Sequence, residues 1–211
     1  MWSVVVAAGR GTRFGGQKQF AMIRGRPMVD WSVAAARSVS DGVVLVVPSG
    51  DGRLSGEGAR GADFVVAGGE TRSSSVRAGI ERVPAEAEVI VVHDGARPLA
   101  SARLFREVVD AVANGADAAV PGIEPSDTLK RVDGDAVVDT LARDEVKAVQ
   151  TPQAFKAGLL RSAHRSGAEA TDDAGLVETL GATVRVVPGD PRNLKVTTPA
   201  DLELVQALAG T

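Results

Sequence analysis

The chain has 211 residues, of which 44% are hydrophobic and 24% charged, and its formal net charge at pH 7 is −3. This composition is typical of a globular protein, and we expect residues 1–211 to form a single domain. The absence of cysteine excludes a disulfide framework, an iron–sulfur cluster and a thiol nucleophile, and the acidic balance argues against nucleic-acid or membrane-surface binding. The sequence shows neither a signal-peptide pattern nor a long apolar run, so we expect a cytoplasmic protein.

Short apolar runs rich in β-branched residues alternate along the chain with segments of helical periodicity. The runs are continuously apolar, as in strands that are covered on both faces. The pattern predicts an α/β fold with a mostly parallel sheet and helices on both faces. In chain order we expect strands at Val4–Ala7, Val43–Val47, Phe64–Val66, Val89–Val92, Ala118–Val120 and Val184–Val187, and helices at Pro27–Val39, Thr71–Val83, Ala102–Ala113, Lys156–Arg165, Asp172–Leu180 and Pro199–Ala209.

Residues 124–141 break this alternation. Two short segments, Thr128–Val132 and Ala136–Thr140, flank an Asp-Gly sequence that favours a hairpin turn. The stretch is too polar to form a core of its own, so we expect a protruding hairpin arm that packs on a second subunit in a homodimer. An active-site flap is the alternative. Residues Pro48–Arg60, rich in Gly and Ser, predict a loop.

The strongest functional signal follows the first strand, where a Gly-rich loop carries Gly9, Gly11, Arg13 and Lys18. Backbone N–H groups of such a loop can approach phosphate closely, and the basic side chains can neutralise its charge. The spacing fits neither the dinucleotide fingerprint, since Phe14 replaces the third Gly, nor the Walker A motif. The loop therefore indicates phosphoryl or nucleotidyl transfer.

Further polar residues follow other strands. Asp94 and Arg97 come at the end of an apolar strand, where open α/β sheets bind ligands, although Asp94 could instead cap a turn. Gly69 allows a base or ribose to approach the backbone closely, and the Ser73–Ser75 run offers hydroxyl and N–H groups to such a ligand. Alternatively, the serines only cap the following helix. Lys195 lies in a strand-like context and either extends to solvent or faces an anion.

We expect neither of the two histidines to act in catalysis. We expect His93 to be a packing residue and His164, on a helix without an acidic neighbour in sequence, to lie on the surface.

The ordered set of motifs resembles the 2-C-methyl-D-erythritol 4-phosphate cytidylyltransferase family from Val4 to about Leu208. The set comprises Ala-Ala-Gly-x-Gly-x-Arg, Lys18, Gly-Gly-x-x-Arg-x-x-Ser-Val, Val-His-Asp-x-Ala-Arg-Pro, Asp-Thr, Thr-Pro-Gln, Thr-Asp-Asp and Asn-x-Lys-Val-Thr. Single blocks occur in other nucleotidyltransferases, whereas the order and the last block are narrower.

The resemblance implies a Rossmann-like nucleotidyltransferase sandwich that transfers the cytidylyl group of CTP to methylerythritol phosphate, with Mg²⁺ bound mainly through the CTP phosphates. It implies that Arg13 and Lys18 stabilise the transition state, and that Arg143 and Lys195 also act in catalysis by positioning the acceptor. Implied nucleotide-binding residues are Ala7, Ala8, Gly9, Gly11, Gly69, Glu70, Ser75, Gly95 and Arg97. Implied acceptor-binding residues are Asp94, Thr128, Arg143, Thr151, Thr171 and Lys195, with Thr128 supplied by a second subunit through the arm.

Three alternatives stay open. The acceptor could be another polyol phosphate, such as ribitol 5-phosphate. A nicotinamide-dependent oxidoreductase is less compatible with Phe14 and with the lack of an acidic residue after the second strand. A catalytically silent nucleotide-binding protein is disfavoured by the joint presence of Arg13, Lys18 and Lys195.

Overall fold

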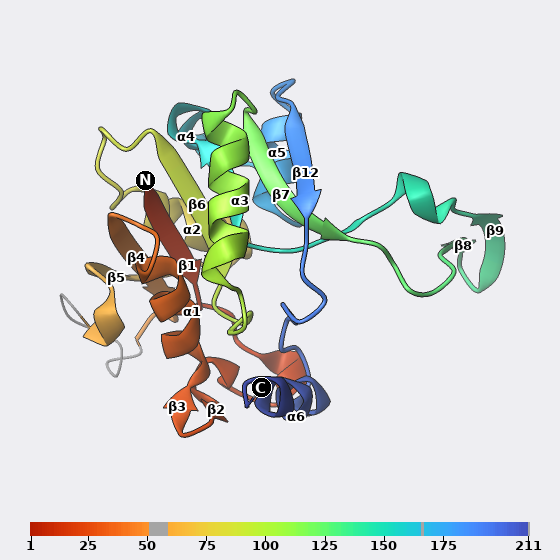
Figure 1. Ribbon diagram of the computed structural model, residues 1–211, viewed down its shortest axis with the longest axis horizontal. Helices are drawn as coiled ribbons and strands as arrows, with labels where there is room; N and C mark the ends of the chain where they lie inside the picture. Colours follow the sequence, from red (N-terminus) through yellow and green to blue (C-terminus); the bar gives the residue numbers. More distant parts are fainter. Residues whose placement is uncertain (51–58, 166, 211) are drawn as a thin grey trace.

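An eight-stranded sheet forms the centre of the molecule in the computed structural model, which describes residues 1–50, 59–165 and 167–210 (Figure 1). Its path is β10-β7-β11-β6-β1-β4-β5, and β12 also pairs with β7. The pairs β1–β4, β1–β6, β4–β5 and β7–β12 are parallel, which confirms the mostly parallel sheet. Its strands are β1 (Trp2–Val6), β4 (Gly42–Val47), β5 (Phe64–Ala67), β6 (Val89–Asp94), β7 (Ala118–Ile123), β10 (Ala148–Val149), β11 (Gln153–Lys156) and β12 (Val184–Pro188).

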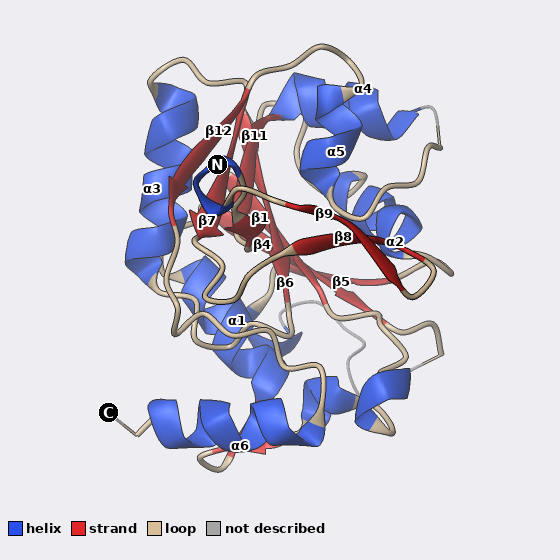
Figure 2. Ribbon diagram, turned by 90° about the vertical axis from the view of Figure 1, so that its right-hand side faces the viewer, coloured by secondary structure: helices blue, strands red, loops and turns tan. Residues whose placement is uncertain are grey.

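Helices cover both faces of this sheet, as predicted (Figure 2). On one face α1 and α3 pack through Val33, Phe105 and Val108, and on the other α2, α4 and α5 pack through Val76, Leu160 and Val177. Both faces of the strands are therefore buried, which is why their sequences are apolar without alternation. The helices are α1 (Met28–Arg37), α2 (Arg72–Ile80), α3 (Ala102–Ala113), α4 (Ala157–Arg165), α5 (Asp173–Glu178) and α6 (Pro199–Leu208).

The helix ends follow the capping residues in the sequence. Ser101 accepts a hydrogen bond from the Leu104 N–H at the start of α3, and Thr198 accepts one from the Asp201 N–H at the start of α6. These bonds satisfy N–H groups that have no partner within the helix. No helix in the described ranges is long and apolar enough to cross a membrane.

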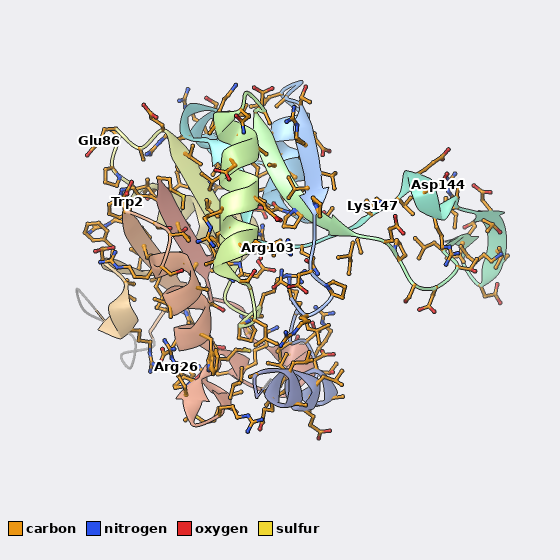
Figure 3. The ribbon with its side chains drawn as sticks, viewed as in Figure 1. Trp2, Arg26, Glu86, Arg103, Asp144 and Lys147 are labelled. Atoms are coloured by element: carbon orange, nitrogen blue, oxygen red, sulfur yellow. The ribbon has the colours of Figure 1, made fainter. Side chains whose placement is uncertain are left out.

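The predicted hairpin arm projects from the body of the molecule (Figures 1 and 3). Its strands β8 (Lys130–Asp133) and β9 (Ala136–Thr140) form a separate two-stranded antiparallel sheet, and all their residues are exposed. Lys147 pairs with Glu124 at 2.9 Å where the arm leaves the body, and Asp144 lies farther out. A second small sheet joins β2 (Met22–Ile23) and β3 (Arg26–Pro27).

Two features differ from the sequence prediction, and one predicted loop lies mostly outside the described residues. Strand β11, which lies antiparallel between β6 and β7, was not predicted, because Gln153–Lys156 is short and lacks β-branched residues. Lys195 lies outside any strand. Of the predicted loop at Pro48–Arg60, residues 51–58 lie outside the described residues.

Candidate active site

A pocket of about 270 Å³ opens at the carboxyl ends of β1 and β6. In open α/β sheets this edge is where ligands bind, because loops leave the strands there and backbone groups are free. The pocket brings together three segments that are far apart in the sequence: the loop after β1, the β5–α2 turn, and the segment before α6. Predicted site residues that line it are Ala7, Ala8, Gly9, Gly11, Arg13, Lys18, Gly69, Glu70, Ser75, Asp94, Gly95 and Lys195.

The loop after β1 folds back on itself around Gly11. Gly11 has a left-handed φ of 66°, and a Cβ there would overlap the Gly16 carbonyl oxygen. The Gly11 carbonyl accepts hydrogen bonds from the N–H groups of Phe14 at 2.9 Å and Gly16 at 3.2 Å. Glycine is therefore required at this position, and the compact loop places Arg13 and Lys18 at the pocket.

The Lys18 ammonium is fixed by the segment that precedes α6. Its Nζ donates a hydrogen bond of 2.7 Å to the Val196 carbonyl. Partial burial, and after it the positive charges of Lys195 and Arg13, hold the pKa of Lys18 below its usual range. Arg13, Lys18 and Lys195 thus share one pocket with a fourth cation, Arg72, and this creates a strongly attractive site for an anion.

Asp94, at the end of β6, pairs with two cations. Its Oδ2 accepts a hydrogen bond of 2.6 Å from Lys195 Nζ, and its Oδ1 lies 3.4 Å from both Nε and Nη2 of Arg72. Burial alone would raise the pKa of Asp94, but Arg72, Lys195 and Arg97 outweigh it and hold that pKa well below its usual range. The carboxylate is therefore ionised throughout the working pH range of an ordinary enzyme.

The β5–α2 turn packs tightly against the first loop. A Cβ on Gly68 would overlap the Ala8 Cβ, and one on Gly69 would overlap the Ser74 hydroxyl. Thr71 and Ser74 form a capping box at the start of α2, and the Ser75 hydroxyl donates 2.8 Å to the Thr71 carbonyl. The turn thus packs closely beside the pocket, where its main-chain groups could contact a small planar ligand.

Five predicted residues do not line the pocket. The Arg97 guanidinium donates to the Asn193 carbonyl at 2.7 Å, and the Thr151 hydroxyl accepts from the Asp94 N–H at 3.0 Å. Thr171 is exposed and precedes the N-cap of α5. Thr128 and Arg143 lie on the arm, where Arg143 donates to the Ser126 carbonyl at 3.1 Å.

The two histidines differ in outcome. His93 is fully buried and bonded to Thr151, which confirms the packing prediction, and burial lowers its pKa to about 4. The prediction for His164 was wrong: it is 2% exposed and its Nε2 lies 2.9 Å from Asp173 Oδ1. Asp173 is nine residues away in sequence, on the next helix, so no local acidic pattern could reveal the pair.

Arg72 is a pocket residue to which the sequence analysis assigned no role. It lies in the Gly-Gly-x-x-Arg-x-x-Ser-Val motif, lines the pocket and contacts both Asp94 and Asp173. The motif placed Arg72 near the site, but its partners come from β6 and α5, which only the tertiary structure brings together.

Comparisons with known proteins find relatives along nearly the whole chain. The sequence model of the family "IspD: 2-C-methyl-D-erythritol 4-phosphate cytidylyltransferase" matches residues 1–210. The enzyme of that name from Deinococcus radiodurans is 43% identical over 99% of this chain and 89% of its own length. The bifunctional enzyme IspD/IspF from Solidesulfovibrio magneticus is 41% identical over 99% of this chain, which spans 57% of that protein.

Solved structures give the same result. The crystal structure of 2-C-methyl-D-erythritol 4-phosphate cytidylyltransferase from Thermus thermophilus superimposes with a TM-score of 0.84 at 36% identity, covering 99% of this chain and 98% of that one. The match therefore includes the pocket, the arm and the segment before α6. This chain belongs to the 2-C-methyl-D-erythritol 4-phosphate cytidylyltransferase family.

Proposed function

We propose that this chain carries out the reaction of its family in the pocket at the ends of β1 and β6. That reaction transfers the cytidylyl group of CTP to 2-C-methyl-D-erythritol 4-phosphate in isoprenoid biosynthesis, giving 4-diphosphocytidyl-2-C-methyl-D-erythritol and pyrophosphate. The single observation that carries the proposal is the convergence of Arg13, Lys18 and Lys195 on one pocket beside Asp94.

The chemistry depends on charge rather than on proton abstraction. The acceptor phosphate is already an anionic nucleophile, so it needs no general base, and the nearest histidine, His93, is buried with a pKa lowered to about 4. The difficulty is to bring two polyanions together while negative charge develops at the α-phosphorus of CTP. Arg13 and Lys18 lie where they would offset that charge, and fixed cations are effective because they need no reorganisation during the reaction.

The nucleotide would occupy the side of the pocket formed by the Gly-rich loop and the β5–α2 turn. The triphosphate would lie against Gly9 and Gly11, and the cytidine against Gly69, Glu70 and Ser75. A Cβ on Gly95 would lie 3.0 Å from the Ala7 Cβ, so this turn also packs closely on the end of β1. Close packing of backbone groups favours selection of the base by shape and by main-chain hydrogen bonds.

The acceptor would bind beside Asp94 and Lys195, and its site would be completed by a second copy of the chain. Thr128 and Arg143 lie on the projecting arm, away from the pocket of their own chain. The arm exposes Val132, Val137 and Val138, each at 57–60%, and such side chains favour contact with another protein surface. We therefore propose a homodimer in which each arm reaches the acceptor site of its partner.

Magnesium is part of the proposal as a companion of the triphosphate. No group of three or more His, Cys, Asp or Glu side chains in the described residues could hold a metal ion. Asp94 already binds Arg72 and Lys195, so the phosphate oxygens of CTP would supply most of the ligands. Bound in this way, Mg²⁺ would neutralise charge on the phosphates. We also propose a cytoplasmic location.

Release of pyrophosphate tests the proposal. The protein is incubated with CTP and Mg²⁺, and either methylerythritol phosphate or ribitol 5-phosphate is added at equal concentration. Faster release of pyrophosphate with methylerythritol phosphate supports the proposed acceptor. Faster release with ribitol 5-phosphate would show that the chain transfers the cytidylyl group to a different acceptor. Absence of release with either acceptor would contradict the proposal.

A further inference from the structure

A chain of hydrogen-bonded polar and ionic side chains runs from α4 and α5 into the acceptor side of the pocket. His164 Nε2 lies 2.9 Å from Asp173 Oδ1, and Asp173 Oδ2 accepts 2.8 Å from Arg72 Nη1. Arg72 then contacts Asp94 Oδ1, and Asp94 Oδ2 accepts from Lys195. Arg72 is the link that joins the buried pair His164–Asp173 to the pair Asp94–Lys195.

The inner half of this chain is buried. Asp173 is 0% exposed and His164 is 2% exposed, so their contact is shielded from solvent. Burial of Arg72 favours its neutral form, but Asp173 and Asp94 outweigh this effect and raise the pKa of Arg72. The guanidinium is therefore charged, and the short contact with Asp173 fixes its orientation.

The outer half depends on this anchor. Each Asp94 oxygen faces a different cation: Oδ1 faces Arg72 and Oδ2 faces Lys195. Without Arg72, Oδ1 would lose its cation, Lys195 would be the remaining partner of both oxygens, and an acceptor phosphate would meet a less well compensated carboxylate. With Arg72 in place, Asp94 can hold a hydroxyl of the acceptor while Lys195 is available to its phosphate.

The start of α2 also holds the segment that carries Thr171. The Thr71 hydroxyl donates 2.9 Å to Glu169 Oε1, and the Ala170 N–H donates 3.4 Å to the Ser73 hydroxyl. Arg72, which contacts Asp173, lies between Thr71 and Ser73 in the sequence. The start of α2 thus contacts Asp94 through Arg72, and the residues that precede Thr171 through Thr71 and Ser73.

We propose that Arg72 is a positioning residue for the acceptor phosphate, held by Asp173 and acting through Asp94 and Lys195. The inference rests on the proposed function, because it takes Asp94 and Lys195 as acceptor contacts. It assigns to the Asp173–His164 pair the task of anchoring Arg72.

The test variant is Arg72→Lys, and its control is Arg77→Ala. A second comparison sets Arg72→Met against the double variant Arg72→Met/Asp173→Asn. Lysine keeps the charge, but a single ammonium cannot reproduce a guanidinium that contacts two carboxylates. Arg77 is the matched control: it lies on the same helix and donates 3.1 Å to the His164 carbonyl, but it does not line the pocket. The double variant removes both charges of the buried pair and leaves an amide to bond His164, so the fold is relieved of an unpaired buried charge.

The readouts are CTP binding at equilibrium, the melting temperature, and kcat and KM for the acceptor. For Arg72→Lys we expect kcat/KM for the acceptor to fall about 10- to 100-fold, with CTP affinity changed by less than about twofold. Arg77→Ala should leave the acceptor KM near that of the wild type. The double variant should melt closer to the wild type than Arg72→Met does, yet keep the high acceptor KM.

Recovery of the acceptor KM together with the melting temperature in the double variant would overturn the inference, because Arg72 would then be purely structural. An equal rise of the acceptor KM in Arg77→Ala would also overturn it. The proposed function is tested separately by the wild-type protein. If that protein prefers another polyol phosphate, the variants are compared on that acceptor, so the two failures are distinguishable.

Discussion

Replacement of Lys18 by alanine should lower kcat far more than it weakens CTP binding. In the free protein the ammonium is held by the Val196 carbonyl at the rim of a loop whose backbone groups remain available to the triphosphate. Ground-state CTP would already be bound by those groups, by Mg²⁺ and by the cytidine contacts. The fixed cation gains importance as charge builds at the α-phosphorus, and interactions stronger in the transition state appear in kcat.

The size of the effect follows from the partial burial of Lys18. Two unit charges about 4 Å apart interact by about 4 kcal/mol at the effective dielectric constant of about 20 that suits a protein surface. Loss of one preorganised electrostatic partner commonly costs ~10²–10³ in rate, or about 3–4 kcal/mol. A partly exposed ion pair contributes at most about 1 kcal/mol to ground-state binding, so CTP affinity should fall no more than roughly fivefold.

Steady-state pyrophosphate release, with CTP varied at saturating acceptor, measures both quantities. Lys156→Ala is the matched control, because Lys156 forms an exposed pair with Asp117 at 2.8 Å and does not line the pocket. Lys18→Arg should recover only part of the rate, since a planar guanidinium cannot take the place of a compact ammonium beside the Val196 carbonyl. A kcat near that of the wild type with a steep rise in KM for CTP would refute the reasoning and make Lys18 a binding residue.

Three further predictions concern stability, assembly and selectivity. His93 should make unfolding pH-dependent: its pKa is 6.5 when unfolded and about 4 when buried, so below pH 6.5 the unfolded chain alone binds the proton. The free energy of unfolding should therefore fall by about 3 kcal/mol towards pH 4 relative to His93→Asn, measured by urea denaturation, and equal slopes would contradict this. The double variant Val137→Asp/Val138→Asp should be a monomer by sedimentation velocity, and it should bind CTP but turn over little acceptor. A monomer with full activity would show that the arm does not contribute to the partner's acceptor site. In competition with CTP, UTP and ATP should bind the pocket with affinities at least about tenfold lower, a difference of about 1.4 kcal/mol. Equal affinities would count against a cytidine site.

The sequence predicted those parts of the fold that follow from local periodicity. Predicted strands and helices all lie within a few residues of observed ones, and α3 matches at both ends because Ser101 caps its start and Asn114 follows its last residue. The short strand β11 and the two-residue strands escaped prediction because pairing with neighbours, rather than composition, makes them strands.

The candidate site was predictable where motifs lie at strand ends and unpredictable where contacts are tertiary. Gly11 and Lys18 follow β1, and Asp94 ends the adjacent strand β6, so their meeting at one edge followed from the α/β pattern. The partners of Arg72 could not be inferred in this way. Asp94 comes from β6 and Asp173 from α5, and no spacing along the chain records that both meet Arg72.

The segment Asn193–Thr197 shows how an irregular stretch can hold charged side chains in place at a pocket. Asn193 is 0% exposed, and its side-chain amide donates 2.8 Å to the Thr151 carbonyl. The Val196 N–H donates 2.8 Å to the Ala96 carbonyl, so the segment is bound to the residues that follow β6. Lys195 reaches Asp94 from this segment, and the next carbonyl, that of Val196, holds Lys18. Both ammonium groups are therefore oriented by the protein itself, and in the proposed reaction a substrate phosphate would displace one carboxylate or one carbonyl contact to engage them.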